Sequence, residues 1–289
     1  MKYSVRHQTQ YFYSDSVAIS YNRIHSNPRN FPYQTFSNAS LTIDPEPAFL
    51  NQQTDFFGNP VTLFTIQESH QKLNAVLMFE AEVHRRTLET PTLPWEEVAR
   101  RLLKPRNPEE LDASQFRFDS TWVKTFDKLT DYARDCFPPG RPVADGGLAL
   151  CQKIFREFTF DNNHTDVSTP IEEVLKSKRG VCQDFAHLAL GALRGMGLSA
   201  RYVSGYLLTL PPPGKEKLQG ADASHAWISI WAPPVGWIDF DPTNNCMVSE
   251  QHITLAIGRD YHDVCPLRGL VLGGGQQLVR VGVDVKEIK

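Results

Sequence analysis

A helical segment followed by three strand-like runs, all between residues 182 and 241, sets the strongest limit on the fold of this chain. Apolar residues recur with helical spacing at Ala186, Ala189, Leu193 and Met196, and Gly197 can end the helix. Strand-forming residues then fill 201–208, 224–231 and 236–241. A helix, a strand and a hairpin in this order predict a helix packed on an antiparallel sheet.

Strand signals dominate the chain up to residue 84. Apolar and polar positions alternate from the start, as expected of a strand with one buried face, at Tyr3, Val5, His7 and Thr9. Later runs rich in β-forming residues cover 40–43, 61–66 and 75–79, with turn-forming clusters between them. We therefore expect a small β-sandwich-like or barrel-like domain over residues 1–84.

A linker and a second domain are expected to follow. Prolines and charges concentrate over residues 85–117, where a short helix is predicted at 95–103. Residues 118–289 then form the second domain. The expected fold class is α+β.

The second domain carries further helix signals before Cys182 and a strand signal at its end. Helical spacing and a favourable first turn predict helices over 122–136 and 145–158 and from Thr169 onward. An alternating run predicts a last strand at 278–285, which we group with this domain.

Composition excludes several classes of function. Hydrophobic residues make up 41% and charged residues 22% of the chain, which is typical of a globular protein. The net charge of −3 and the pI near 6.3 indicate neither a nucleic acid nor an anionic membrane as partner. The first residues lack a charged segment followed by an apolar run, and no stretch approaches the length of a membrane span. We expect a cytoplasmic location.

The cysteines favour neither a disulfide framework nor a zinc site. They are five in number, widely spaced and without a C-x-x-C pair. Cys136 and Cys151 fall on apolar stripes of the predicted helices, which favours core positions for both.

Cys182 is the first residue of its expected helix. A thiolate there is stabilised by free backbone N–H groups and by the positive end of the helix dipole, which lowers the pKa of a thiol. The competing interpretation is a small buried side chain, because most free cysteines are core residues. A suitable base and acid elsewhere in the chain would favour a nucleophile instead.

His225 and Asp241 are the candidate base and acid. They lie on adjacent predicted strands whose alternation places both side chains on a common side. If the helix of Cys182 packs across that side, the three residues form a triad of nucleophile, base and orienting acid. Asp239 shares the face of Asp241 and is the fallback. Asp241 is preferred because it lies at the strand end, where side chains can converge on a cleft.

Two other histidines are weaker candidates for the base. His187 lies five residues after Cys182, about 140° around the helix, and cannot easily reach the thiol. His164 lies in a polar loop and could approach through the fold, but no neighbour in the sequence would orient it. A single histidine is more often structural than catalytic, so His225 depends on its combination with Cys182 and Asp241.

Three blocks of the sequence resemble the core of the bacterial transglutaminase-like superfamily. They cover 179–188 around Cys182, 224–227 around His225 and 236–244 around Asp241. Further similarity to the bacterial branch extends over 7–11, 55–59 and 258–261. The resemblance implies a papain-like or transglutaminase-like core after an N-terminal β domain, with the family's cysteine, histidine and aspartate at these three residues. The acidic cluster of the calcium-dependent animal enzymes is not recognisable here, so no metal or other cofactor is expected.

The resemblance also implies a reaction class, since the superfamily contains both amide hydrolysis and amine transfer. We expect Cys182 to attack a peptide or carboxamide carbonyl and to form a thioester. The backbone N–H of Cys182 would stabilise the oxyanion, with Gln183 as a weak candidate for a second donor. Hydrolysis is favoured because the polar loop 209–223 does not obviously shield the site from water. The expected partner is a protein or peptide substrate.

Three alternatives to hydrolysis remain. The first is transfer of the acyl group to an amine, as in transglutaminases. The second is a non-catalytic binding protein with a degenerate core, against which the intact Cys, His and Asp set argues. The third is acyl transfer of the arylamine acetyltransferase kind, which uses the same triad order but whose N-terminal domain does not match.

Overall fold

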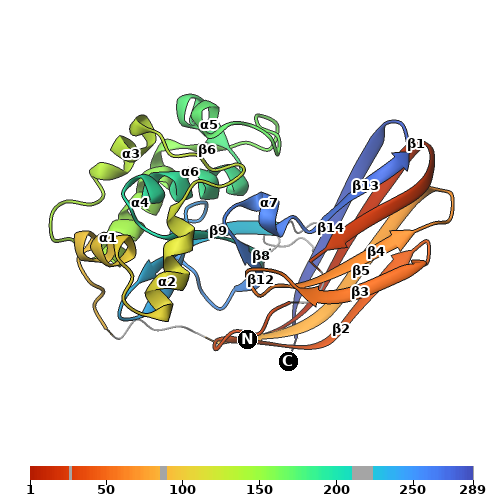
Figure 1. Ribbon diagram of the computed structural model, residues 1–289, viewed down its shortest axis with the longest axis horizontal. Coiled ribbons are helices and arrows are strands. Elements are labelled where there is room, and N and C mark those ends of the chain that lie inside the picture. The colour runs from red at the N-terminus through yellow and green to blue at the C-terminus, as the bar shows by residue number, and fades with distance from the viewer. Residues whose placement is uncertain (26–27, 85–89, 210–223, 289) are drawn as a thin grey trace, which may run out of the picture.

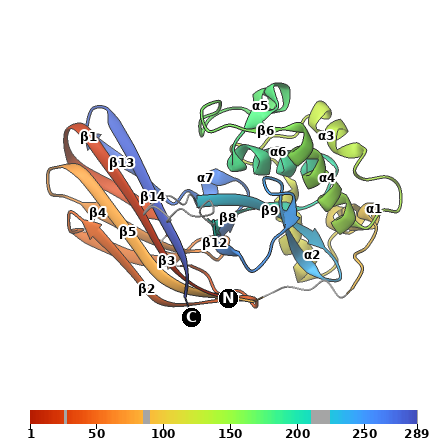
Figure 2. The ribbon, with the colours of Figure 1, turned by 180° about the vertical axis from the view of Figure 1, so that it is seen from behind.

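The computed structural model describes residues 1–25, 28–84, 90–209 and 224–288. Figure 1 shows two lobes side by side, one made of long strands and the other of helices around a smaller sheet. The view from behind shows the two ends of the chain close together at the base of the strand lobe (Figure 2). Among the described residues no helix combines the length and the apolar character needed to cross a membrane.

A long first strand, β1 (Lys2–Ile24), is the centre of the N-terminal sheet. Its early residues alternate between buried and half-buried positions, as the sequence pattern predicts. The other strands of this half of the chain are β2 (Gln34–Asp44), β3 (Phe49–Thr54), β4 (Pro60–Ile66) and β5 (His70–Val83). The antiparallel order is β2-β5-β1-β4-β3, so the predicted β-rich domain is one curled sheet.

The last two strands return to this sheet. β13 (Leu267–Gly273) and β14 (Gln277–Ile288) both pair with β1, and together they follow it along almost its whole length. The strand predicted at 278–285 is therefore present, but its grouping with the second domain differs from the observed pairing. The reason is physical: an alternating pattern shows that a segment is a strand with a buried face, and does not identify its partner.

The second sheet forms the centre of the core domain. Its strands are β8 (Ala200–Leu207), β9 (Ser224–Ala232), β10 (Gly236–Asp241), β11 (Cys246–Met247) and β12 (His252–Gly258). They are antiparallel in the order β11-β10-β9-β8-β12. The strands and hairpin predicted after Cys182 are thus in place. A short parallel pair, β6 (Thr159–Phe160) and β7 (Arg179–Gly180), precedes the sheet.

Helices surround the core sheet. They are α1 (Trp95–Leu103), α2 (Pro108–Ser114), the 3-10 turn η1 (Gln115–Arg117), α3 (Asp127–Arg134), α4 (Val143–Glu157), α5 (Ile171–Ser177), α6 (Cys182–Gly195) and α7 (Tyr261–Val264). The helix α1 has the predicted bounds, and Gly197 follows α6 with a positive φ of 78°, the left-handed stop expected there.

The predicted helix over 122–136 is shorter than expected. Its first residues do not enter the helix because carboxylates hold their backbone instead. The N–H of Trp122 donates to Asp260 at 2.7 Å, and that of Thr125 donates to Asp119 at 2.9 Å. These bonds satisfy donors that a helix would otherwise use, and α3 begins only at Asp127.

The two domains share a buried boundary. Apolar side chains of the first sheet, including Tyr3 and Phe79, form one cluster with Tyr206, Ile253 and Leu255 of the core sheet. Buried polar side chains of the first domain also bond to the core, and they reach the free edge of β12. The boundary is therefore packed like an interior rather than like a flexible hinge.

Candidate active site

The N-terminus of α6 places Cys182 at a tightly built loop. The carboxylate of Asp184 accepts hydrogen bonds from the N–H of Val181 at 2.8 Å and from the hydroxyl of Thr165 at 2.6 Å. A Cβ at Gly180 would lie 2.6 Å from the same oxygen of Asp184, so only glycine allows this close approach. Cys182 follows as a half-buried residue at the first turn of the helix.

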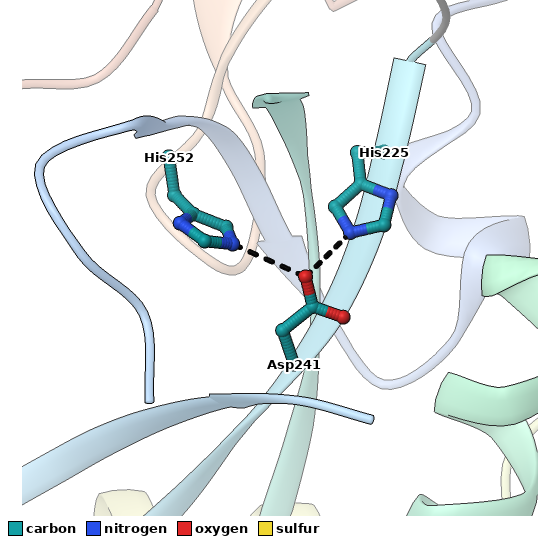
Figure 3. Close-up of side chains that lie close together, drawn as sticks. All are labelled: His225, Asp241 and His252. Atoms are coloured by element: carbon teal, nitrogen blue, oxygen red, sulfur yellow. Dashed lines mark hydrogen bonds and ion pairs between the residues drawn. The ribbon is translucent and has the colours of Figure 1, made fainter. Parts of the chain in front are cut away.

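His225 and Asp241 form a close pair, in which His225 is half-buried. Nε2 of His225 lies 2.7 Å from Oδ2 of Asp241, as Figure 3 shows. Asp241 is fully buried, and its other oxygen accepts the backbone N–H groups of Thr243 and Asn244 at 2.9 and 3.2 Å. Between the two carboxylates considered from the sequence, Asp241 is therefore the one that meets His225.

Cys182 is the third residue of this group. Because Nε2 of His225 is bound to Asp241, Nδ1 is the ring nitrogen left for the thiol, with which His225 also hydrogen-bonds. Burial alone would lower the pKa of His225, but the hydrogen bonds and charges of Asp241 and Cys182 raise it to about 10. The geometry thus favours a protonated imidazole between a carboxylate and a sulfur at neutral pH.

Asp241 has the complementary shift. Burial raises the pKa of its carboxyl group, but hydrogen bonds from His225 and His252 and the charge of His225 hold that pKa well below its usual range. The carboxylate is therefore charged in the folded protein despite its complete burial.

The helix α6 covers the opposite face of the sheet from the one considered in the sequence analysis. Ala226, Ile228 and Phe240 share a core cluster with α6, whereas Trp227 belongs to a separate cluster on the other face. The three residues meet nevertheless, because Cys182 begins its helix and His225 is the second residue of β9. The thiol reaches the imidazole around the strand end rather than across the sheet.

His252, on β12, is a member of the cluster that the sequence analysis missed. Its Nε2 lies 3.1 Å from Oδ2 of Asp241, the same oxygen that meets His225 (Figure 3). Nothing local in the sequence identifies His252 as a neighbour of Asp241. In the sheet, β8 lies between β12 and β9, the strand that carries His225. The only sequence signal was a histidine at the start of a mostly apolar run, which does not show what the histidine contacts.

The group His225, Asp241 and His252 has the composition of a metal site, with ligand atoms within 4.8 Å of one another. The protonation of His252 argues against metal binding. The N–H of Ser249 donates to its Nδ1 at 3.3 Å, which requires a lone pair there and leaves the proton on Nε2. A metal at Nε2 would require the ring proton on Nδ1, where it would meet the N–H of Ser249, so this arrangement fits donation from Nε2 to Asp241 instead.

The other candidates lie apart from the triad. His187 is buried, and its Nε2 accepts the N–H of Tyr261 at 3.1 Å. His164 is exposed in the loop after β6. Gln183 donates its side-chain amide to the carbonyl of Val167 at 3.1 Å, so one of its hydrogens is engaged away from Cys182.

Comparison with known proteins follows the same two-domain division. The chain matches the bacterial transglutaminase-like N-terminal region over residues 3–82 and the transglutaminase-like superfamily over residues 130–242. Uncharacterized proteins of Mycobacterium tuberculosis (strain ATCC 25618 / H37Rv) and Mycobacterium leprae (strain TN) are 38% and 32% identical to it. Each match covers 98% of this chain. It covers 92% of the Mycobacterium tuberculosis protein and 98% of the Mycobacterium leprae protein. The chain belongs to the bacterial transglutaminase-like superfamily.

A solved structure supports the fold. The crystal structure of a "Putative Cysteine Protease" from Cytophaga hutchinsonii superposes with a TM-score of 0.78 at 18% identity, covering 100% of this chain and 91% of that one. The protein-glutamine gamma-glutamyltransferase of Pseudomonas aeruginosa is 37% identical over 99 residues, which are 33% of this chain and 15% of that protein. The fold is thus α+β with a transglutaminase-like core.

Proposed function

We propose that the protein is a thiol-dependent amide or peptide hydrolase that acts through Cys182, His225 and Asp241. The observation that carries the proposal is the contact of 2.7 Å between His225 and the buried Asp241, with His225 also hydrogen-bonded to a cysteine at a helix start. A nucleophile, a base and an orienting acid in this order are the parts that acyl transfer by a thiol requires.

The proposed reaction begins with the sulfur of Cys182 attacking the carbonyl carbon of a peptide or carboxamide. The oxyanion of the tetrahedral intermediate forms next to the first turn of α6, where the backbone N–H of Cys182 can donate to it. His225 gives its proton to the leaving amine, and a thioester remains. Water, deprotonated by His225, then attacks the thioester and releases the acid.

The high pKa of His225 suits the first half of this cycle. At about 10, the imidazole is protonated at neutral pH, so it can act as the acid for a leaving amine. Asp241 stabilises this imidazolium and holds the ring with Nδ1 available to the sulfur. Both roles require a charged carboxylate.

Transfer to an amine is the second candidate. It is favoured by the similarity to the protein-glutamine gamma-glutamyltransferase of Pseudomonas aeruginosa over 99 residues. Water and an amine compete for the same thioester, so access to the site decides between the two reactions. The loop 209–223, on which the sequence-based preference for hydrolysis rests, lies outside the described residues except for Thr209.

Product analysis tests the proposal. The protein is incubated with a set of peptides, including glutamine-containing ones, with and without a primary amine, and the products are identified by mass. Cleaved or deamidated products in both samples would support hydrolysis, whereas amine adducts would support transfer instead. Cys182→Ala should abolish either reaction, and Cys136→Ala, at a buried position just after α3, should not. Absence of products with any substrate, together with an unreactive Cys182, would favour the non-catalytic binding protein.

A further inference from the structure

We propose that His252 is a positioning residue, a neutral imidazole held by Ser249 that fixes the carboxylate of Asp241 in the orientation that serves His225. The proposal rests on the proposed function for its catalytic consequence. The positioning itself is a property of the folded protein and can be measured without a substrate.

The protonation of His252 follows from its partners. The N–H of Ser249 can only donate, so Nδ1 of His252 accepts at 3.3 Å, and the hydroxyl of Ser249 lies 3.5 Å from the same atom. The single ring proton of a neutral imidazole is therefore on Nε2. This N–H points to Oδ2 of Asp241, 3.1 Å away, and both side chains are buried.

The two oxygens of Asp241 are held from different directions. Oδ1 accepts two backbone N–H groups of the turn after β10. Oδ2 meets His225 at 2.7 Å, the amide of Asn244 at 2.7 Å and His252 at 3.1 Å. Asn244 belongs to the same turn as Asp241, whereas His252 comes from β12. His252 is thus the donor that ties the carboxylate to a distant strand of the sheet.

The packing around His252 leaves it little freedom. The ring of Trp227 stands edge-on to it, with centroids 5.3 Å apart, and also lies 6.1 Å from the ring of His225. A Cβ at Gly205 would approach Trp227 to 2.5 Å, so this glycine leaves the space that the indole occupies. The rings of His225, His252 and Trp227 therefore form a triangle, in which the two imidazoles lie 6.2 Å apart and both reach Asp241.

The strand that carries His252 is itself anchored to the N-terminal domain. Buried side-chain amides of Gln34 and Asn59 bond to the backbone of β12 at Thr254 and Ile257. The first domain thereby contributes to the position of His252. This gives the β domain a part in the geometry of the site without direct contact with a substrate.

The effect on His225 distinguishes positioning from simple charge stabilisation. The titratable groups facing His225 are Asp241 from β10, Cys182 from α6 and His252 from β12, and the amide of Asn244 lies 3.2 Å from its Nε2. The polar groups facing His252 are Asp241 and Ser249. If His252 only stabilised the charge of Asp241, its loss would make the carboxylate a stronger hydrogen-bond acceptor. The pKa of His225 would then stay the same or rise. If it positions the carboxylate, its loss lets Asp241 turn away, and the pKa of His225 falls.

The experiment is an NMR titration of the histidine rings in the full chain. In the unaltered protein, ring nitrogen shifts should show the Nε2–H form of His252 and an imidazolium at His225 beyond pH 8. His252→Leu should lower the midpoint of His225 by a pH unit or more, and His252→Gln, which keeps a donor near the position of Nε2, should largely restore it. An Nδ1–H form of His252, or an unchanged or raised midpoint in His252→Leu, would overturn the proposal.

Two additions keep the test decisive. If His252→Leu does not fold, His252→Asn, whose amide is too short to reach Asp241, takes its place, and the ring protonation of the unaltered protein is independent of any variant. Where the protein turns over a substrate, His252→Leu should lower kcat by up to about 100-fold, since small misplacements have effects of that size, with KM little changed. Absence of turnover in the unaltered protein would contradict the proposed function and leave the titration to decide on His252.

Discussion

The side-chain amide of Gln34 forms a reciprocal pair of hydrogen bonds with the backbone of Thr254. Its Nε2 donates to the carbonyl at 2.7 Å, and its Oε1 accepts the N–H at 2.8 Å. Asn59 repeats the arrangement with Ile257, at 2.7 and 2.9 Å. Both amides thus imitate a neighbouring strand along the edge of β12. An uncovered edge would expose unpaired backbone groups, so the first domain completes the sheet of the second.

Removal of either amide should destabilise the protein. Gln34→Ala or Asn59→Ala leaves a buried N–H and a buried carbonyl without their partners, which costs about 1–3 kcal/mol of the free energy of unfolding. Urea unfolding measures the loss. Gln53→Ala, at an exposed position of β3, is the control and should change little. Equal effects of Gln34→Ala and the control would show that the amide pairs do not support the boundary.

Cys182 should be the fastest of the five thiols to react with iodoacetamide at neutral pH. Burial raises the pKa of Cys136, Cys151 and Cys265, and raises that of Cys246 to about 11, which disfavours their thiolates. Cys182 instead lies beside a protonated His225. Peptide mapping by mass spectrometry at short times identifies the labelled residue. Preferential labelling of any other cysteine, or a rate in His225→Gln equal to that of the unaltered protein, would argue against an activated nucleophile.

Asp241→Asn should be far more damaging than Asp239→Asn. The amide has the shape of the carboxylate but lacks the charge that stabilises the imidazolium of His225, and comparable changes in a triad reduce kcat by about 10⁴. Turnover of the substrate found by product analysis measures the effect. Asp239 is also buried on the same strand, so its variant controls for burial. A similar loss in both variants would remove the distinction between the two carboxylates.

Stability should depend on pH through His225 in a defined direction. Its pKa is raised from 6.5 to about 10 in the folded protein, so its contribution is fully present below pH 6.5 and is lost as the pH rises through 10. Asp241 has a lowered pKa, and its contribution is present above the unfolded value and is lost as the pH falls toward the folded one. Urea unfolding from pH 6 to 10 should therefore show a fall that His225→Gln reduces. A parallel fall in that variant would assign the loss to other groups.

The local parts of this structure could be predicted from the sequence because each has a periodic signal. Helix α1, the start of α6 at Cys182 and the hairpin that carries His225 and Asp241 all follow apolar spacing. The contact of His225 with Asp241 could be predicted as well, since adjacent strands fix which side chains face one another.

The remaining features depend on contacts between segments far apart in the chain. His252 meets Asp241 only because β12 joins the sheet beyond β8, and no local pattern specifies that order. The helix expected over 122–136 begins later because carboxylates accept the backbone N–H groups of its first residues. One of these carboxylates is Asp260, 138 residues beyond Trp122. Similarly, the alternation in β14 predicts a strand but does not reveal β1 as its neighbour.

The return of β13 and β14 to β1 also affects the order in which the protein can fold on the ribosome. One edge of β1 is made early but receives its partner strands only after the whole transglutaminase-like core has emerged. The core is therefore free to collapse before β13 and β14 pair with β1. Until then β1 presents an unpaired edge, and the nascent chain is exposed to wrong pairing there while the core is being synthesised.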